Sequence, residues 1–106
     1  MPHFPIQFQQ LPRFDGPFDA FRLAAQGCDV LFASYPGATV IPEHTHATDN
    51  VGVVTQGELT LMLDGGAEPR FGVGSWYHVP ANVAHSARFE VPTSAIEFWF
   101  EAAPRA

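Results

Sequence analysis

The sequence predicts a small all-β domain of the barrel or sandwich type, and three observations support this fold class. Ten prolines and nine glycines are spread along 106 residues, a density that would interrupt long helices. Apolar and polar residues alternate through most of the chain, which is the period of a strand with one buried face. Turn signals recur about every 8–12 residues, as in antiparallel barrels and sandwiches.

The composition supports one packed domain and argues against several kinds of partner. Hydrophobic residues make up 46% of the chain and charged residues 15%, so a core is expected and disorder is not. The net charge of -6, with five scattered arginines and no lysine, argues against nucleic acid or an anionic membrane. No apolar run reaches the roughly 20 residues of a membrane span, and no signal peptide is recognised. Cys28, the single cysteine, is expected to be a small buried hydrophobe, and a cytoplasmic location is expected.

The first quarter of the chain has the weakest pattern. Residues 1–16 are expected to form an N-terminal arm with one short strand at residues 6–8, followed by a single barrel domain over residues 17–106. The one helix-like stretch is residues 18–26, although Phe21 and Leu23 also alternate there as in a strand.

The rest of the chain is predicted as strands. Eight or nine strands of roughly five residues are expected. After residue 26 they cover residues 30–35, 38–41, 51–55, 59–63, 75–79, 85–89 and 95–101. The runs 51–55 and 59–63 lie on either side of Gly57 and predict a hairpin.

The segment Pro42-Glu43-His44-Thr45-His46 is the first that contains candidate metal ligands. Residues i and i+2 of a strand point to the same face, so His44 and His46 would project side by side. Two imidazoles placed in this way can share one metal ion. Taken alone, His-x-His is a weak signal for a pair of metal ligands.

The residues around this pair resemble the two sequence motifs of the cupin superfamily. Gly37, His44, His46, Asn50 and Gly57 have the spacing of the first motif, and Gly74, Pro80-Ala81-Asn82 and His85 have the spacing of the second. The match covers residues 37–89, half of the chain. The resemblance implies a double-stranded β-helix, or jelly-roll, cupin barrel of the RmlC-like type, which would assemble as a homodimer and cover its strand edges.

The resemblance also implies the ligand set. His44, His46 and His85 match the histidine ligands of the family, and Asn50 stands where the family most often has a glutamate ligand. The amide of Asn50 offers only a neutral carbonyl oxygen, which can bind the ion directly or through a water molecule. Asp49 is the alternative, but a residue one position along a strand points to the opposite face.

Several turn residues of the motifs are also matched. Gly37, Gly57 and Gly74 correspond to turn glycines, where positive φ is expected. Asn82 replaces a glycine of the family, and asparagine is the other residue that readily occupies the left-handed region. Pro80 fixes φ in the turn that delivers the last histidine.

The expected cofactor is one divalent metal ion per chain, Zn, Ni, Mn, Fe or Co, and the ligand types do not choose among them. Three neutral imidazoles and a neutral amide would leave the ion close to its full charge. Such an ion attracts anionic ligands and acts as a strong Lewis acid. No carboxylate base is evident beside it, which favours Lewis-acid chemistry over reactions that need a glutamate to shuttle protons.

Other residues near the motifs are candidates for the pocket wall. These are Gln56, Thr60, Phe89, Phe98 and Phe100. In the last strand, the face that carries Phe98 is expected to line the interior, whereas Trp99 is expected at a partly exposed position or an interface. Arg22 and Arg88 are expected in surface ion pairs, with a substrate carboxylate as the alternative partner. His3 and His78 have no partner at ligand spacing.

The leading functional hypothesis is a metal-dependent enzyme for a small oxygenated or carboxylate-bearing molecule. Isomerase, lyase, decarboxylase and dioxygenase chemistry all remain open, and no catalytic residue is assigned. The alternative is a non-catalytic module that binds a small molecule or senses the metal. A cupin without any metal is third, because all three histidine positions are filled.

Overall fold

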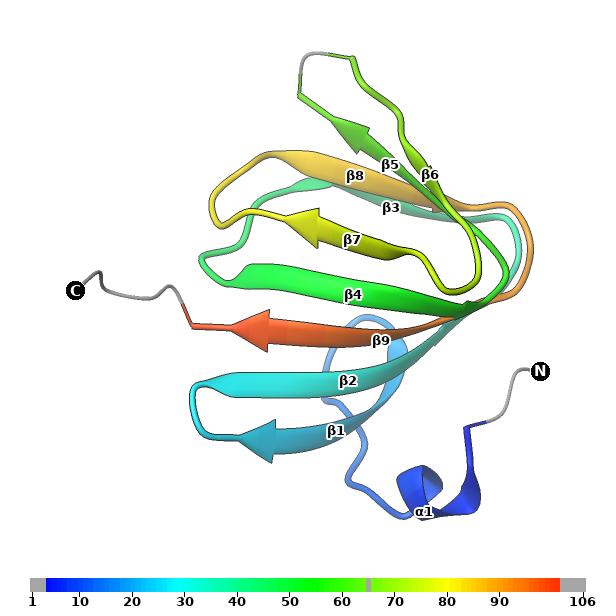
Figure 1. Cartoon of the computed structure of the whole chain (residues 1–106), viewed down its shortest axis with the longest axis vertical. Helices are drawn as coiled ribbons and strands as arrows, with labels where there is room; N and C mark the ends of the chain where they lie inside the picture. The colour runs from blue at the N-terminus through cyan, green and yellow to red at the C-terminus, as the bar shows by residue number, and fades with distance from the viewer. Residues whose placement is uncertain (1–3, 65, 102–106) are drawn as a thin grey trace.

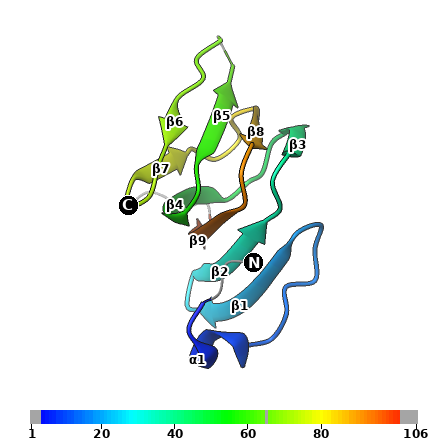
Figure 2. The same ribbon diagram turned by 90° about the vertical axis from the view of Figure 1, so that its right-hand side faces the viewer.

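The computed structural model describes residues 4–64 and 66–101, which form two facing antiparallel sheets (Figures 1 and 2). The elements are α1 (Ile6–Gln9), β1 (Asp19–Ala25), β2 (Cys28–Tyr35), β3 (Thr39–His44), β4 (Asp49–Gln56), β5 (Leu59–Leu63), β6 (Arg70–Phe71), β7 (Trp76–Val79), β8 (His85–Phe89) and β9 (Thr93–Phe100). One sheet has the order β1-β2-β9-β4-β7 and the other β3-β8-β5-β6. The predicted all-β jelly-roll architecture is confirmed. Within the described ranges, no helix is long and apolar enough to cross a membrane.

The main core lies between the two sheets, as the alternation of β2 shows. Leu31, Ala33 and Tyr35 point inward and pack with residues of the second sheet. Val30 and Phe32 point to the outer face, where they form a second cluster. β2 is therefore buried on both faces, which explains its nearly continuous apolar sequence.

The outer cluster also includes the N-terminal segment, where the predicted strand at residues 6–8 is wrong. These residues form the single turn α1, which begins after Pro5. The turn brings Phe4 and Phe8 onto the same ring of Phe32, with ring centroids 5.5 and 4.3 Å away. An extended segment would point successive side chains to opposite sides, so contacts with other elements decide the local structure here.

The helix-like reading of residues 18–26 is also wrong, because this stretch forms β1, which pairs along its whole length with β2. β1 is an edge strand and most of its side chains are exposed. An exposed edge strand carries little alternation, which is why its sequence pattern was ambiguous.

The hairpin predicted around Gly57 does not form, because β4 and β5 belong to different sheets. β4 pairs with β7 and β9, whereas β5 pairs with β6 and β8. Gly57 has a φ of 84°, and a Cβ atom there would lie 2.4 Å from the carbonyl oxygen of Pro92. The chain thus crosses from one sheet to the other in close contact with the start of β9.

The expected positive φ angles occur at most motif positions. Gly74 has a φ of 85° and Asn82 a φ of 66°, so asparagine does take over the left-handed position of the family glycine. Gly37 is the exception, since the positive φ of this turn falls on Ala38, at 62°. Gly37 instead lies close to the backbone of the β8–β9 turn, where an added Cβ would meet the carbonyl oxygen of Glu90 at 3.2 Å.

β3 contains an irregularity that determines which of its residues face inward. Ile41 lies opposite Ala87 of β8, but His44 lies opposite His85, so β3 has one more residue than β8 between these two pairs. The extra residue is a β-bulge, which shifts the alternation by one position. His44 therefore faces the interior beside His85, although its parity differs from that of Ile41.

Candidate metal centre

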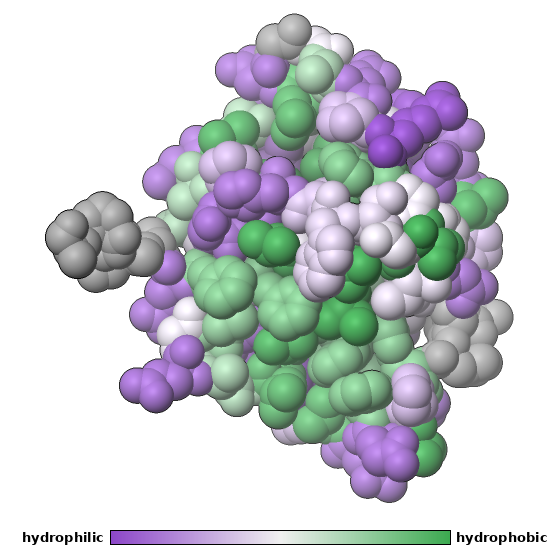
Figure 3. Space-filling model, in the orientation of Figure 1, coloured by the Kyte–Doolittle hydropathy of each residue, from purple (hydrophilic) through white to green (hydrophobic). Residues whose placement is uncertain are grey.

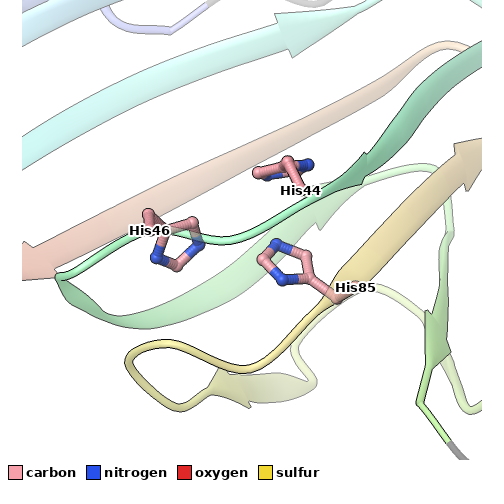
Figure 4. A group of neighbouring side chains, drawn as sticks. All are labelled: His44, His46 and His85. Atoms are coloured by element: carbon pink, nitrogen blue, oxygen red, sulfur yellow. The ribbon is translucent and has the colours of Figure 1, made fainter.

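Three histidines from three different segments converge between the sheets (Figure 4). His44 ends β3, His46 follows in the loop before β4, and His85 begins β8. One ring nitrogen of each lies within 4.8 Å of the others. The three histidines come together as the sequence predicted, but the prediction that His44 and His46 lie on one strand is wrong. β3 ends at His44, so His46 reaches the group from a loop and not from the next inward position of a strand. We call these residues the histidine triad.

The backbone fixes the orientation of all three imidazole rings. The Nδ1 atoms of His44, His46 and His85 lie 2.8, 2.9 and 2.9 Å from the carbonyl oxygens of Pro42, Thr48 and Val83. A carbonyl oxygen can only accept a hydrogen bond, so each Nδ1 is the protonated nitrogen. Each Nε2 is left with a lone pair, which is the state that a metal-binding histidine requires.

Two buried polar atoms at this place have no hydrogen-bond partner among the described residues: Nε2 of His46 and Oδ1 of Asn50. Asn50 is 6% exposed and lies in β4, directly opposite Trp99, whose ring is 4.8 Å from that of His46. Buried acceptors without a partner are costly, and a cation would satisfy both. The donor set of imidazole nitrogens and an amide oxygen therefore fits a divalent metal ion.

The neighbourhood of the triad separates these residues from nearby alternatives. Asp49 points to the outer surface, where its Oδ1 lies 2.7 Å from Nε2 of exposed His78, so it is not placed as a substitute ligand. The backbone N–H of Asn82 donates to the carbonyl oxygen of His46 at 2.8 Å. This bond joins the loop that carries His46 to the turn that delivers His85.

A cavity of about 530 Å³ opens beside the triad, a volume typical of small-molecule sites. Most of its wall is apolar, with side chains such as Phe18, Ile41, Leu61 and Phe89. No lysine or arginine lines it, and Arg22 and Arg88 instead form exposed ion pairs with Asp29 and Glu90. These two pairs are the surface contacts that the sequence led us to expect.

The cavity also contains a carboxyl group that sequence reasoning missed. Glu97, in β9, is only 4% exposed and lines the cavity. It accepts hydrogen bonds from the Tyr35 hydroxyl and, at 3.1 Å, from the indole N–H of Trp99. We call these three residues the carboxyl cluster. The expectation that no carboxylate base lies near the site is therefore wrong, since β9 supplies one from outside the motifs.

Burial sets the protonation of these groups. It raises the pKa of the Glu97 carboxyl from 4.5 to about 7, against the hydrogen bonds from Tyr35 and Trp99, which act to lower it. Burial and the nearby carboxyl together raise the pKa of the Tyr35 and Tyr77 hydroxyls well above their usual value. Burial also lowers the pKa of His85, with His44 and His46 acting in the same direction, which favours the neutral ring.

The predicted face of β9 is the reverse of the observed one. Glu97 and Trp99 line the cavity, whereas Phe98 belongs to the outer cluster and Phe100 is 41% exposed. Alternation shows that two sets of residues lie on opposite faces, but it does not say which face is inside. Phe98 instead packs against the outer cluster, which is built largely from β2 and the N-terminal segment.

The remaining pocket candidates divide in the same way. Phe89 lines the cavity and stacks on Tyr35, with ring centroids 4.0 Å apart. Thr60 is buried but lies opposite Arg88, between Leu59 and Leu61, which face the cavity. Gln56 is exposed at the end of β4, beyond an irregularity in its pairing with β9. His3 lies outside the described residues.

A family model described as "Cupin domain" matches residues 30–100, more than half of the chain. None of the curated proteins matches this chain in sequence. Many solved structures share the fold. An RmlC-like cupin from Shewanella frigidimarina superposes with a TM-score of 0.76 at 20% identity, covering 94% of this chain and 89% of the other.

Two further solved structures are similar in fold. KdgF from Halomonas sp. gives a TM-score of 0.71 at 21% identity, with 87% of each chain covered. The DMSP lyase DddQ from Ruegeria pomeroyi gives 0.72 at 19% identity, covering 93% of this chain but only 56% of DddQ. At these identities the likeness concerns the fold alone.

Proposed function

The chain belongs to the cupin domain family, and from that premise we propose that it is a metal-dependent enzyme acting on a small oxygenated molecule. One observation carries the proposal: ring nitrogens of the three histidines lie within 4.8 Å of one another, each Nδ1 beside a backbone carbonyl oxygen, next to a cavity of about 530 Å³. A ligand group prepared in this way and open to a cavity is typical of catalytic metal sites. The similarity to a structure named as a lyase agrees with it.

In this proposal His44, His46 and His85 hold the ion, with Asn50 as an oxygen ligand or as the partner of a bound water. A divalent ion there would supply Lewis-acid polarisation of a substrate oxygen. The apolar walls exclude water and bind the body of the substrate, and the carboxyl cluster provides the second polar group. Isomerase and lyase chemistry fit this arrangement better than the sequence suggested, because a carboxyl group is present after all.

The direct test is metal content followed by turnover. The purified chain should contain, or take up, one divalent ion per molecule. The metal-loaded chain is then screened for turnover of small carboxylates, diketones and sugars, with His46→Ala as the control. Stoichiometric metal and ligand binding without turnover would identify a binding or sensing module. A chain that binds no metal would refute both functions.

The contribution of the uncharged Asn50 side chain to metal binding can be tested by substitution. Asn50→Ala removes the orphaned amide oxygen and should weaken Zn²⁺ binding by about tenfold, the lower end of the effect of losing an auxiliary partner. Asn50→Asp adds a negative charge at nearly the same volume and should tighten binding. Competition titration with a chromophoric chelator measures both. Equal affinity in all three chains would exclude Asn50 from the site.

We further propose that the chain forms a homodimer through the outer face of the five-stranded sheet. Hydrophobic side chains gather on this face (Figure 3). Trp76 is 59% exposed and Phe100 41% exposed, and Phe98 lies between them with ring centroids 6.2 and 6.5 Å away. A row of exposed aromatic side chains is typical of an interface, where burial of tryptophan contributes strongly.

Trp76→Asp should therefore weaken self-association by about tenfold, because it places a charge in an apolar contact. Sedimentation equilibrium measures the effect against wild type, whose mass should be twice the 11.6 kDa of the chain. Val91→Asp is the matched control, since Val91 is 48% exposed in the turn before β9. A monomeric wild-type chain would contradict the proposed dimer.

A further inference from the structure

We infer that Glu97 exchanges a proton with the ligand held at the histidine triad, so that the site performs proton transfer at a carbon next to a carbonyl group. The inference rests on the proposed function, because the triad must first hold an ion that binds the ligand oxygen. It adds a catalytic residue outside both cupin motifs and narrows the class of reaction.

The geometry places the carboxyl group and the triad on two sides of one side chain. The indole N–H of Trp99 donates to Oε1 of Glu97 at 3.1 Å, and the same ring packs edge-on against His46 with centroids 4.8 Å apart. The indole ring of Trp99 therefore contacts both Glu97 and His46. Glu97 lines the same cavity as His44 and His85 of the triad.

The backbone of β4 leaves space at this place. Gly52 lies opposite Glu97 on one side and opposite Tyr77 on the other. A Cβ atom at Gly52 would come within 2.3 Å of the Tyr77 hydroxyl, so the absence of a side chain is what allows this hydroxyl to lie near the carboxyl group. Tyr77 also lines the cavity and can donate a hydrogen bond to a ligand.

Glu97 has the hydrogen-bonding pattern of a proton carrier and not of a structural ion pair. It is buried without any lysine or arginine in the cavity wall, and its partners are the neutral donors Tyr35 and Trp99. Its pKa near 7 means that both protonation states are accessible at neutral pH. Because the cavity wall adds no positive side chain to the charge of the ion, the ligand class is a small neutral or singly charged carbonyl compound.

The proposed step balances without a further reactant. Ionised Glu97 takes a proton from the carbon next to the ligand carbonyl. The C–H electron pair becomes a carbon–carbon π bond, and the carbonyl π pair moves to oxygen. Where the ligand has a double bond conjugated with the new one, return of the proton to its far carbon restores the carbonyl group and yields an isomer. Alternatively, departure of a group from the next carbon, with its bonding pair, yields an elimination product.

Acetohydroxamic acid is a suitable probe, because it is a neutral weak acid that loses a proton when it chelates a metal ion through two oxygens. Its binding to the Zn²⁺-loaded chain is measured by calorimetry at about pH 8 in two buffers of different ionisation enthalpy, which gives the number of protons released. Wild type should release fewer protons than Glu97→Gln, since Glu97 takes up part of the proton. Glu97→Gln should release about one per site, and Glu90→Gln, an exposed control, should behave as wild type.

A second measurement needs no variant. In wild-type chain with ¹³C-labelled glutamate carboxyl groups, the Glu97 resonance should move toward its protonated position when the probe binds. Equal proton release from wild type and Glu97→Gln, or an unmoved Glu97 resonance, would overturn the inference. Failure of acetohydroxamic acid to bind the Zn²⁺-loaded chain would also overturn it and leave the metal site intact. Failure to bind Zn²⁺ would instead refute the proposed function itself.

Discussion

His85→Ala is expected to weaken Zn²⁺ binding by more than about 100-fold, beyond the effect of losing a mere hydrogen-bond partner of a ligand. His85 is the most buried member of the triad, at 5% exposed, and its Nδ1 is held by the carbonyl oxygen of Val83. Alanine leaves two imidazoles and one amide, which cannot enclose the ion. Competition titration gives the dissociation constants directly.

The same variant should lose the stabilisation that metal binding gives. Wild type at a free Zn²⁺ concentration 100 times its dissociation constant gains about 2.7 kcal/mol, whereas His85→Ala should show no change in melting temperature with Zn²⁺. His44→Ala provides a second test at an exposed position, in case the cavity left by His85 prevents folding. His78→Ala is the matched control, because His78 pairs with Asp49 on the outer surface. Unchanged affinity in both triad variants would exclude the site.

Glu97→Gln is expected to change how stability depends on pH in the metal-free chain. In the unfolded chain Glu97 loses its proton near pH 4.5, but in the folded chain it keeps the proton up to about pH 7. Between these values the folded state binds more protons, so stability falls as the pH rises through this window. The pKa difference corresponds to a loss of about 3 kcal/mol that is complete above pH 7.

Glutamine cannot ionise, yet it can keep both contacts, because its oxygen accepts from Trp99 and its amide donates to Tyr35. The variant should therefore gain about 3 kcal/mol over wild type between about pH 4.5 and about pH 7.5. Urea denaturation with a chelator present measures this difference, in which the shared titration of His85 cancels. Glu90→Gln, at an exposed position, should track wild type. Parallel curves for Glu97→Gln and wild type would show that the carboxyl group is not buried in its neutral form.

The sequence was sufficient for those features that depend on neighbouring residues. Alternation located most strands from residue 28 onward, and motif spacing alone grouped His44, His46 and His85. Asn82 took the left-handed conformation because that preference belongs to the residue itself.

The wrong predictions all concern features that depend on residues far apart in the sequence. Glu97 is hidden in sequence because Tyr35, which donates a hydrogen bond to it, lies 62 positions away. Which side of β9 faces the cavity depends on the packing of Phe98 against the outer cluster, to which the N-terminal segment contributes. Local alternation gives two equivalent solutions for such a strand, and only tertiary packing selects one of them.

The bulge in β3 determines whether this strand contributes a metal ligand to the cavity. Ile41 and His44 both face inward because one extra residue lies between their pairs with β8. Regular pairing of β3 with β8, without the bulge, would put His44, three positions after Ile41, on the outer face with no change in the amino-acid sequence. In this fold, the residues that can react are thus determined partly by strand register, which decides which side chains face the cavity. The pairing of β3 with β8 therefore decides whether the imidazole of His44 reaches the cavity, a route between active and inert barrels that substitutions at the ligands do not offer.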